Sequence, residues 1–80
     1  MDNQQIFGKL ISIVKSIKSE VSINENSGLI RDSILDSLEF MNYITKVEES
    51  FSLKITDAEI VDQELGIIKN MIDFISSKIQ

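Results

Sequence analysis

The 80-residue chain contains no cysteine and no histidine. These absences exclude disulfides, thiol nucleophiles, zinc sites with the usual ligands and a histidine general base. Proline is also absent, and neither an internal repeat nor a break in composition marks a second domain, so we expect one domain spanning residues 1–80. A chain of this length rarely builds the two walls of an enzyme cleft. We therefore expect a protein that is not an enzyme.

Positive charge is scarce as well. Eight lysines and arginines oppose thirteen acids, which gives a net charge of −5. This balance is unfavourable for nucleic-acid binding, and a helix-turn-helix reading would bring Glu39, Glu48 and Glu49 toward phosphates. A basic protein partner suits the charge better. Long apolar runs are missing too, since no stretch approaches the ~18 residues of a membrane-spanning helix. We expect a cytoplasmic monomer without a membrane span.

Metal and nucleotide sites are not predicted. The chain has no glycine-rich phosphate loop. The acids Asp57, Glu59, Asp62 and Glu64 lack the glycine and the spacing of a calcium loop, so they are interpreted as a solvated helix face. Glu48 and Glu49 are adjacent on a predicted helix and point in different directions, which argues against a catalytic pair of carboxylates.

Apolar residues make up 42% of the chain, enough for a core. A capping box at Asp2–Gln5 precedes a helical pattern, which predicts a helix from about residue 3 to about residue 18. The pattern consists of Ile6, Leu10, Ile13, Val14 and Ile17. Residues 19–36 then form a long loop, whose apolar residues indicate that parts of it pack on the helices.

A second helix is predicted from residue 37 to about residue 50. Its inward positions are Phe40, Tyr43, Ile44, Val47 and Phe51. Leu38 and Met41 are further apolar residues of this helix, beyond those that its core-facing side needs. They form a partner-facing patch beside Glu39, Asn42, Thr45 and Glu48, or else they are core residues under the loop.

Two further helices complete an all-α fold. Residues 52–55 alternate like a strand but have no partner strand, so they are predicted to be loop. Thr56 and Glu59 form a capping box for a short helix that ends near Asp62. A last helix carries an apolar stripe of Leu65, Ile68, Ile72, Ile75 and Ile79, with Met71 and Phe74 alongside.

Ser37 lies where the loop meets the second helix, within Asp36-Ser37-Leu38. A helix start offers unpaired N–H groups and the positive end of the helix dipole, which favour a phosphodiester on Ser37. The alternative is that Asp36 or Ser37 only caps the helix.

The order of elements, the Asp36-Ser37-Leu38 site and the run Val47-Glu48-Glu49 before Phe51 resemble the acyl carrier protein family along nearly the whole chain. The resemblance implies the acyl-carrier four-helix bundle and a 4'-phosphopantetheine arm on Ser37, whose thiol carries acyl or aminoacyl groups as thioesters. It also implies that Asp36 orients Ser37 or assists the metal site of the transferase. The implied partners are a phosphopantetheinyl transferase, a loading ligase, and downstream transferases or synthases. Leu38, Glu39, Met41 and Glu48 would contact them.

The chain departs from the family pattern at three places. Ile34 replaces a glycine, Thr56 replaces a proline and Asn42 replaces an acid, while Lys46 further reduces the acidity of the second helix. These departures favour a discrete carrier in a specialised pathway, such as a natural-product pathway or aminoacyl transfer like that of the D-alanyl carriers, over housekeeping fatty-acid synthesis. The alternative from another class is a small helical interaction module without a prosthetic group.

Overall fold

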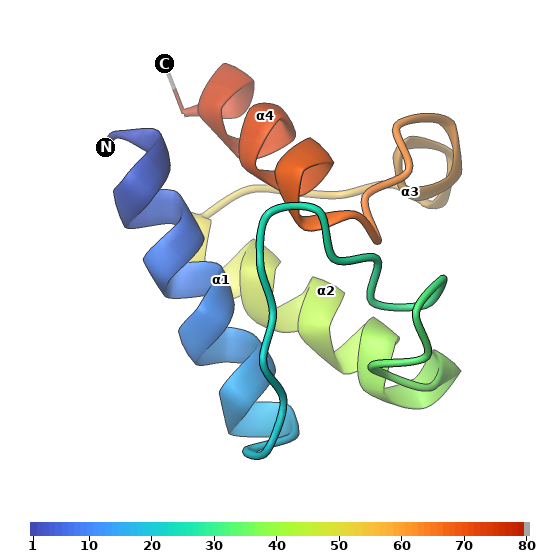
Figure 1. Cartoon of the computed structure of the whole chain (residues 1–80). Helices are drawn as coiled ribbons and strands as arrows, with labels where there is room; N and C mark the ends of the chain where they lie inside the picture. Colours follow the sequence, from blue (N-terminus) through green and yellow to red (C-terminus); the bar gives the residue numbers. More distant parts are fainter. Residues whose placement is uncertain (80) are drawn as a thin grey trace.

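The computed structural model describes residues 1–79, and over that range the chain forms four helices and no strand. They are α1 (Asn3–Ile17), α2 (Ser37–Phe51), α3 (Asp57–Asp62) and α4 (Ile68–Lys78). In Figure 1, α1 lies against both α2 and α4, and the short α3 lies on the opposite side from α1. The predicted all-α architecture is confirmed.

Three of the helices begin with the capping boxes that the sequence predicts or allows. Asp2 Oδ1 accepts the Gln5 N–H at 2.8 Å and Gln5 Oε1 accepts the Asp2 N–H at 3.0 Å. Thr56 and Glu59 repeat this arrangement at the start of α3. Each box satisfies N–H groups that the helix itself leaves without partners, which explains why these helices start where they do.

The core is built from the helix faces that the apolar periodicity indicates. All five inward positions predicted for α2 are buried, as are Ile6, Leu10, Ile13 and Val14 of α1. The loop contributes Leu29 and Leu35, both buried, and the half-buried Val21, Ile23 and Ile34. The expectation that parts of the loop pack on the helices is confirmed.

The last helix begins later than the sequence pattern predicts. Leu65 is fully buried but precedes α4, which starts at Ile68, and Ile79 caps its other end. The N-cap Ile67, between Leu65 and the helix, has extended backbone with φ −89° and ψ 126°, which is not helical. Including Leu65 in the last helix was therefore wrong, because a buried residue of a turn mimicked the helical period.

The start of α4 has no side-chain cap, and the long loop supplies the missing acceptors. The Ile68 N–H donates to Ser27 O at 3.0 Å and the Lys69 N–H donates to Glu25 O at 2.8 Å. Nearby, the Leu29 N–H donates to Gly66 O at 2.8 Å. These bonds join the loop to the α3–α4 connection and fix one side of the cavity described below.

The loop is itself organised by a charged pair. The Arg31 guanidinium donates to both carboxylate oxygens of Asp32, at 3.0 and 3.1 Å, and to Asn26 O at 2.7 Å. Asp32 Oδ2 also accepts the Gly28 N–H at 2.8 Å. The hydrogen bond from Arg31 and then that from Gly28 lower the pKa of Asp32 from 3.8 to about 2.

Asp32→Asn is expected to lower the melting temperature at neutral pH and to flatten the acid limb of the stability curve. A carboxylate with a lowered pKa in the folded state stabilises it above the unfolded pKa near 3.8, and this contribution is lost as the pH falls toward about 2. The difference between wild type and Asp32→Asn should therefore be full above pH 4 and should vanish near pH 2. Melting curves across this range test it, with Asp73→Asn on exposed α4 surface as control. A difference that persists unchanged at pH 2 contradicts it.

Candidate functional site

Ser37 is the first residue of α2, and Asp36 is its N-cap. Asp36 Oδ1 accepts the Glu39 N–H at 2.8 Å, and Glu39 Oε1 accepts the Asp36 N–H at 2.9 Å. This capping box resolves the question of which residue caps the helix. Because Asp36 does so, the exposed Ser37 is not required for the cap.

Electrostatics at the site combine the helix terminus with one lysine from another element. The first turn of α2 presents the positive end of the helix dipole. Lys18, the C-cap of α1, places Nζ 3.2 Å from Ile34 O and 3.8 Å from Glu39 Oε1. These partners lie on either side of Ser37 in the sequence. Lys18 therefore brings a positive charge to the two segments that flank Ser37, in a protein whose net charge is −5.

Leu38 and Met41 are exposed beside Ser37. Their exposed fractions are 82% and 48%, so the alternative that they are core residues is excluded. Met41 lines a shallow groove between α2 and the end of α1, together with Ser16, Ile17, Leu38, Glu39, Asn42 and Thr45. The structure thus brings together five of the six residues predicted to face partners.

The sixth, Glu48, lies elsewhere. It is half-buried, and its Oε2 accepts the Ile55 N–H at 2.8 Å, which ties the end of α2 to the segment before α3. Together with Thr45 it lines a different depression. Glu48 therefore has a structural role that its position in the sequence did not reveal.

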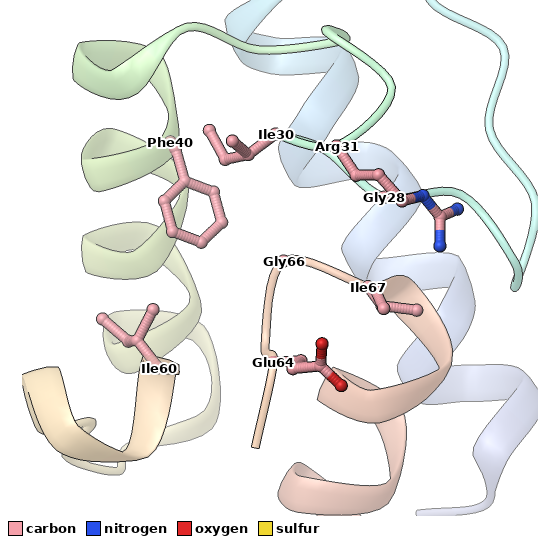
Figure 2. Close-up of a pocket in the computed structure, with 8 residues that line it drawn as sticks. All are labelled: Gly28, Ile30, Arg31, Phe40, Ile60, Glu64, Gly66 and Ile67. Carbon is pink, nitrogen blue, oxygen red and sulfur yellow. The ribbon is translucent and has the colours of Figure 1, made fainter. Parts of the chain in front are cut away.

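A cavity of about 310 Å³ lies between α2, α3 and the long loop, and the sequence did not predict it. Figure 2 shows Phe40 on α2 and Ile60 on α3 on one side, with Ile30, Gly66 and Ile67 around the space. Arg31, Glu64 and Gly28 complete the lining. Phe40 comes three residues after Ser37, so this part of the cavity wall lies about one helical turn along α2 from the serine. The long loop, α2 and the α3–α4 region are far apart in the sequence, so no local pattern could reveal a cavity that they line together.

Within residues 1–79, no group of three or more carboxylate side chains could hold a metal ion. None of the helices in that range is long and apolar enough to cross a membrane.

Comparison with known proteins identifies the family. The chain is 30% identical to an acyl carrier protein of Coprothermobacter proteolyticus over 81 residues, which cover 99% of this chain and 96% of that protein. The chain belongs to the acyl carrier protein family.

Other acyl carrier proteins show similar agreement. That of Buchnera aphidicola is 33% identical, over 88% of this chain and 85% of its own length. That of Borreliella burgdorferi is 31% identical, over 98% of both chains. No family model matches the chain. No solved structure matches it either. These relatives are matched along most of their length. Membership in the family establishes that the chain is a carrier protein rather than an enzyme.

Replacing the two residues at the start of α2 is expected to have unequal effects. Asp36→Ala removes the cap and should cost about 0.5–2 kcal/mol of unfolding free energy, whereas Ser37→Ala leaves the capping box intact and should cost only a few tenths of a kcal/mol, about the effect of an exposed surface substitution. Urea unfolding followed by circular dichroism measures both, and Asp36→Asn, which retains a capping oxygen, serves as the matched control. Equal losses for Asp36→Ala and Ser37→Ala would show that the serine is part of the cap.

Proposed function

We propose that Ser37 is the attachment site of 4'-phosphopantetheine, transferred to its hydroxyl by a phosphopantetheinyl transferase. The observation that carries the proposal is an exposed serine at the first position of α2 whose cap is supplied by its neighbour Asp36. The hydroxyl is thus available, while the helix terminus favours the negative charge of a phosphodiester. When bound, the group supplies a terminal thiol that holds acyl or aminoacyl groups as thioesters.

The roles of the flanking residues follow from their contacts. Asp36 fixes the backbone at the start of α2, so it orients Ser37 toward solvent. Lys18 offsets part of the negative charge that a phosphodiester would add next to Asp36 and Glu39. Because the chain has no cysteine, no thiol of the protein itself competes for the thioester.

The cavity suits the cargo of such an arm. Its side-chain lining is mainly apolar, with Ile30, Phe40, Ile60 and Ile67 around the space that Figure 2 shows. Burying an apolar chain there is favourable by about 25 cal/mol per Å² of apolar surface removed from water. Its wall begins about one turn from Ser37, so an acyl group on a flexible arm lies within reach.

Partner enzymes are proposed to bind the surface formed by Leu38, Glu39, Met41, Asn42 and Thr45. Leu38 and Met41 supply exposed apolar area next to the modified serine, as anchors of a small interface would. Asn42 and Thr45 are uncharged, and the carboxylate of Glu39 is engaged by the Asp36 N–H and by Lys18.

The same surface supports a carrier of a specialised pathway. Near Ser37, Lys18 offsets part of the negative charge of Glu39, and the carboxylate of Glu48 is directed to the Ile55 N–H instead of toward this surface. A loading ligase and downstream enzymes for acyl or aminoacyl cargo would then recognise apolar shape more than acidity. Asn42 and Lys46 further reduce the acidity of α2.

Incubation with coenzyme A, magnesium and a phosphopantetheinyl transferase is expected to add one phosphopantetheine to the wild-type chain and none to Ser37→Ala. Intact-mass spectrometry measures this. Ser22→Ala, which changes an exposed serine of the long loop, is the control and should be modified like wild type. An unmodified wild type, or equal modification of Ser37→Ala, would contradict the assignment and favour an interaction module without a prosthetic group.

Partner recognition is expected to depend more on Met41 than on the charge of Glu39. Met41→Ala should lower kcat/KM of the transferase by about tenfold at every salt concentration, because loss of an apolar anchor typically costs more than 1 kcal/mol. Glu39→Gln keeps an oxygen for the cap and removes the charge, so it should slow the reaction modestly and only at low salt. Val61→Ala, which trims an exposed apolar residue of α3, controls for loss of surface area. A larger, salt-dependent effect of Glu39→Gln would reverse the proposed order.

A further inference from the structure

The polar side-chain contacts between α1 and the rest of the molecule converge on Lys18. Within residues 1–79, this lysine makes the only side-chain hydrogen bond and the only ion pair that join α1 or its caps to another segment. Its Nζ donates to Ile34 O at 3.2 Å and lies 3.8 Å from Glu39 Oε1. Ile34 comes three residues before Ser37, and Glu39 comes two residues after it. One lysine of another element thus contacts both flanks of the candidate attachment site.

The backbone of Lys18 is itself held in place. Its N–H donates to Val14 O in the last turn of α1 at 2.8 Å, and its carbonyl accepts the Val21 N–H at 3.4 Å. The apolar face of α1 belongs to the core. The contact from Lys18 to Ile34 therefore ties the end of the long loop to a helix that is packed in the core.

The segment before Ser37 is held from its other side by the loop. The N–H groups of Ile34 and Leu35 both donate to Leu29 O, at 3.0 and 2.9 Å, and the side chain of Leu35 is buried. Ile34 thus gives its N–H to the loop and its carbonyl to Lys18. The residues that lead into the serine are consequently held between the loop and the end of α1.

We infer that Lys18 is a positioning residue for the modification of Ser37. By holding the Ile34 carbonyl, it fixes the direction in which the chain enters α2, and with it the direction of the Ser37 hydroxyl. The inference rests on the proposed attachment at Ser37. In that reaction the serine oxygen forms a bond to the phosphorus next to the pantetheine, its proton passes to a base, and the bond from this phosphorus to adenosine bisphosphate breaks.

This role differs from that of the exposed apolar residues Leu38 and Met41. Those side chains are proposed to bind partner enzymes, so their loss should weaken binding. The ammonium of Lys18 is directed to groups of its own chain, so its loss should misplace the hydroxyl in the bound protein. Phosphoryl transfer depends almost entirely on positioning and electrostatic stabilisation, and a misplacement of about 1 Å can cost about 100-fold in rate.

Steady-state kinetics of a phosphopantetheinyl transferase with coenzyme A, magnesium and the full chain test the inference. Lys18→Met removes the ammonium and keeps a long side chain, whereas Lys18→Arg keeps the charge and the donor. Lys15→Met is the matched control, because it removes the same charge from the exposed surface of the last turn of α1.

Lys18→Met should lower kcat by about tenfold and leave KM for the carrier within about twofold of wild type, because a positioning contact acts after binding. Lys18→Arg and Lys15→Met should have kinetics close to those of wild type. The melting temperature of Lys18→Met should stay close to that of wild type, since an exposed ion pair contributes little to stability.

Other results overturn the inference. A higher KM with unchanged kcat in Lys18→Met would show that the lysine contacts the transferase itself. An equal loss in Lys15→Met would assign the effect to net charge, and a large fall in the melting temperature of Lys18→Met would assign the lysine to the stability of the fold. A loss that Lys18→Arg does not restore would also contradict the proposed contact.

The same assay separates this inference from the attachment on which it rests. Unchanged kinetics of Lys18→Met, in an assay where wild type gains the mass of phosphopantetheine and Ser37→Ala does not, would contradict the role of Lys18 alone. A wild type that gains no mass would contradict attachment at Ser37, and the positioning role would be overturned with it.

Discussion

Two reciprocal hydrogen bonds between Asp36 and Glu39 determine the geometry on which the site depends. They satisfy N–H groups at the start of α2, and they do so with side chains on either side of Ser37. The serine is left exposed at a capped helix start. A cap supplied by Ser37 itself would have consumed the hydroxyl that a carrier must offer to its modifying enzyme. Asp36 and Glu39 thus stabilise the start of the helix, and the hydroxyl of Ser37 is not needed for it.

The long loop has an equivalent role on the other side of the cavity. Its carbonyls at Glu25 and Ser27 accept the first N–H groups of α4, and Leu29 bonds to Gly66. The Arg31–Asp32 pair fixes the next part of the loop, where Asp32 also accepts the Gly28 N–H. These hydrogen bonds fix the backbone on one side of the cavity. Another part of the wall is the side chain of Phe40, which lies about one helical turn from Ser37 on α2.

Much of this could be predicted from the sequence because it is local. Capping boxes at Asp2 and Thr56 and the inward face of α2 follow from spacing of three or four residues, and the structure reproduces them. The start of α4 could not be predicted from the sequence, because no residue there forms a side-chain cap. Its first N–H groups are instead bonded by a loop about forty residues earlier in the chain. Leu65 has the right period but belongs to a turn.

The candidate site was likewise predictable only where it depends on local sequence. Ser37 and the exposed Leu38 and Met41 could be found from the boundary of α2 and its excess of apolar residues. The engagement of Glu48 by Ile55 and the approach of Lys18 depend on tertiary packing. The carboxylate of Glu48 is therefore directed to the α2–α3 connection, whereas that of Glu39 lies beside Lys18.

The central claim is that Ser37 can be modified without disturbing the capped helix behind it. Amide chemical shifts of isotope-labelled protein before and after phosphopantetheine transfer test this most directly. The account predicts shifts concentrated at residues 36–41 and at Lys18, with Asp36 and Glu39 amides still protected from exchange with solvent. Shifts centred on another serine, or loss of protection at the start of α2, would contradict it.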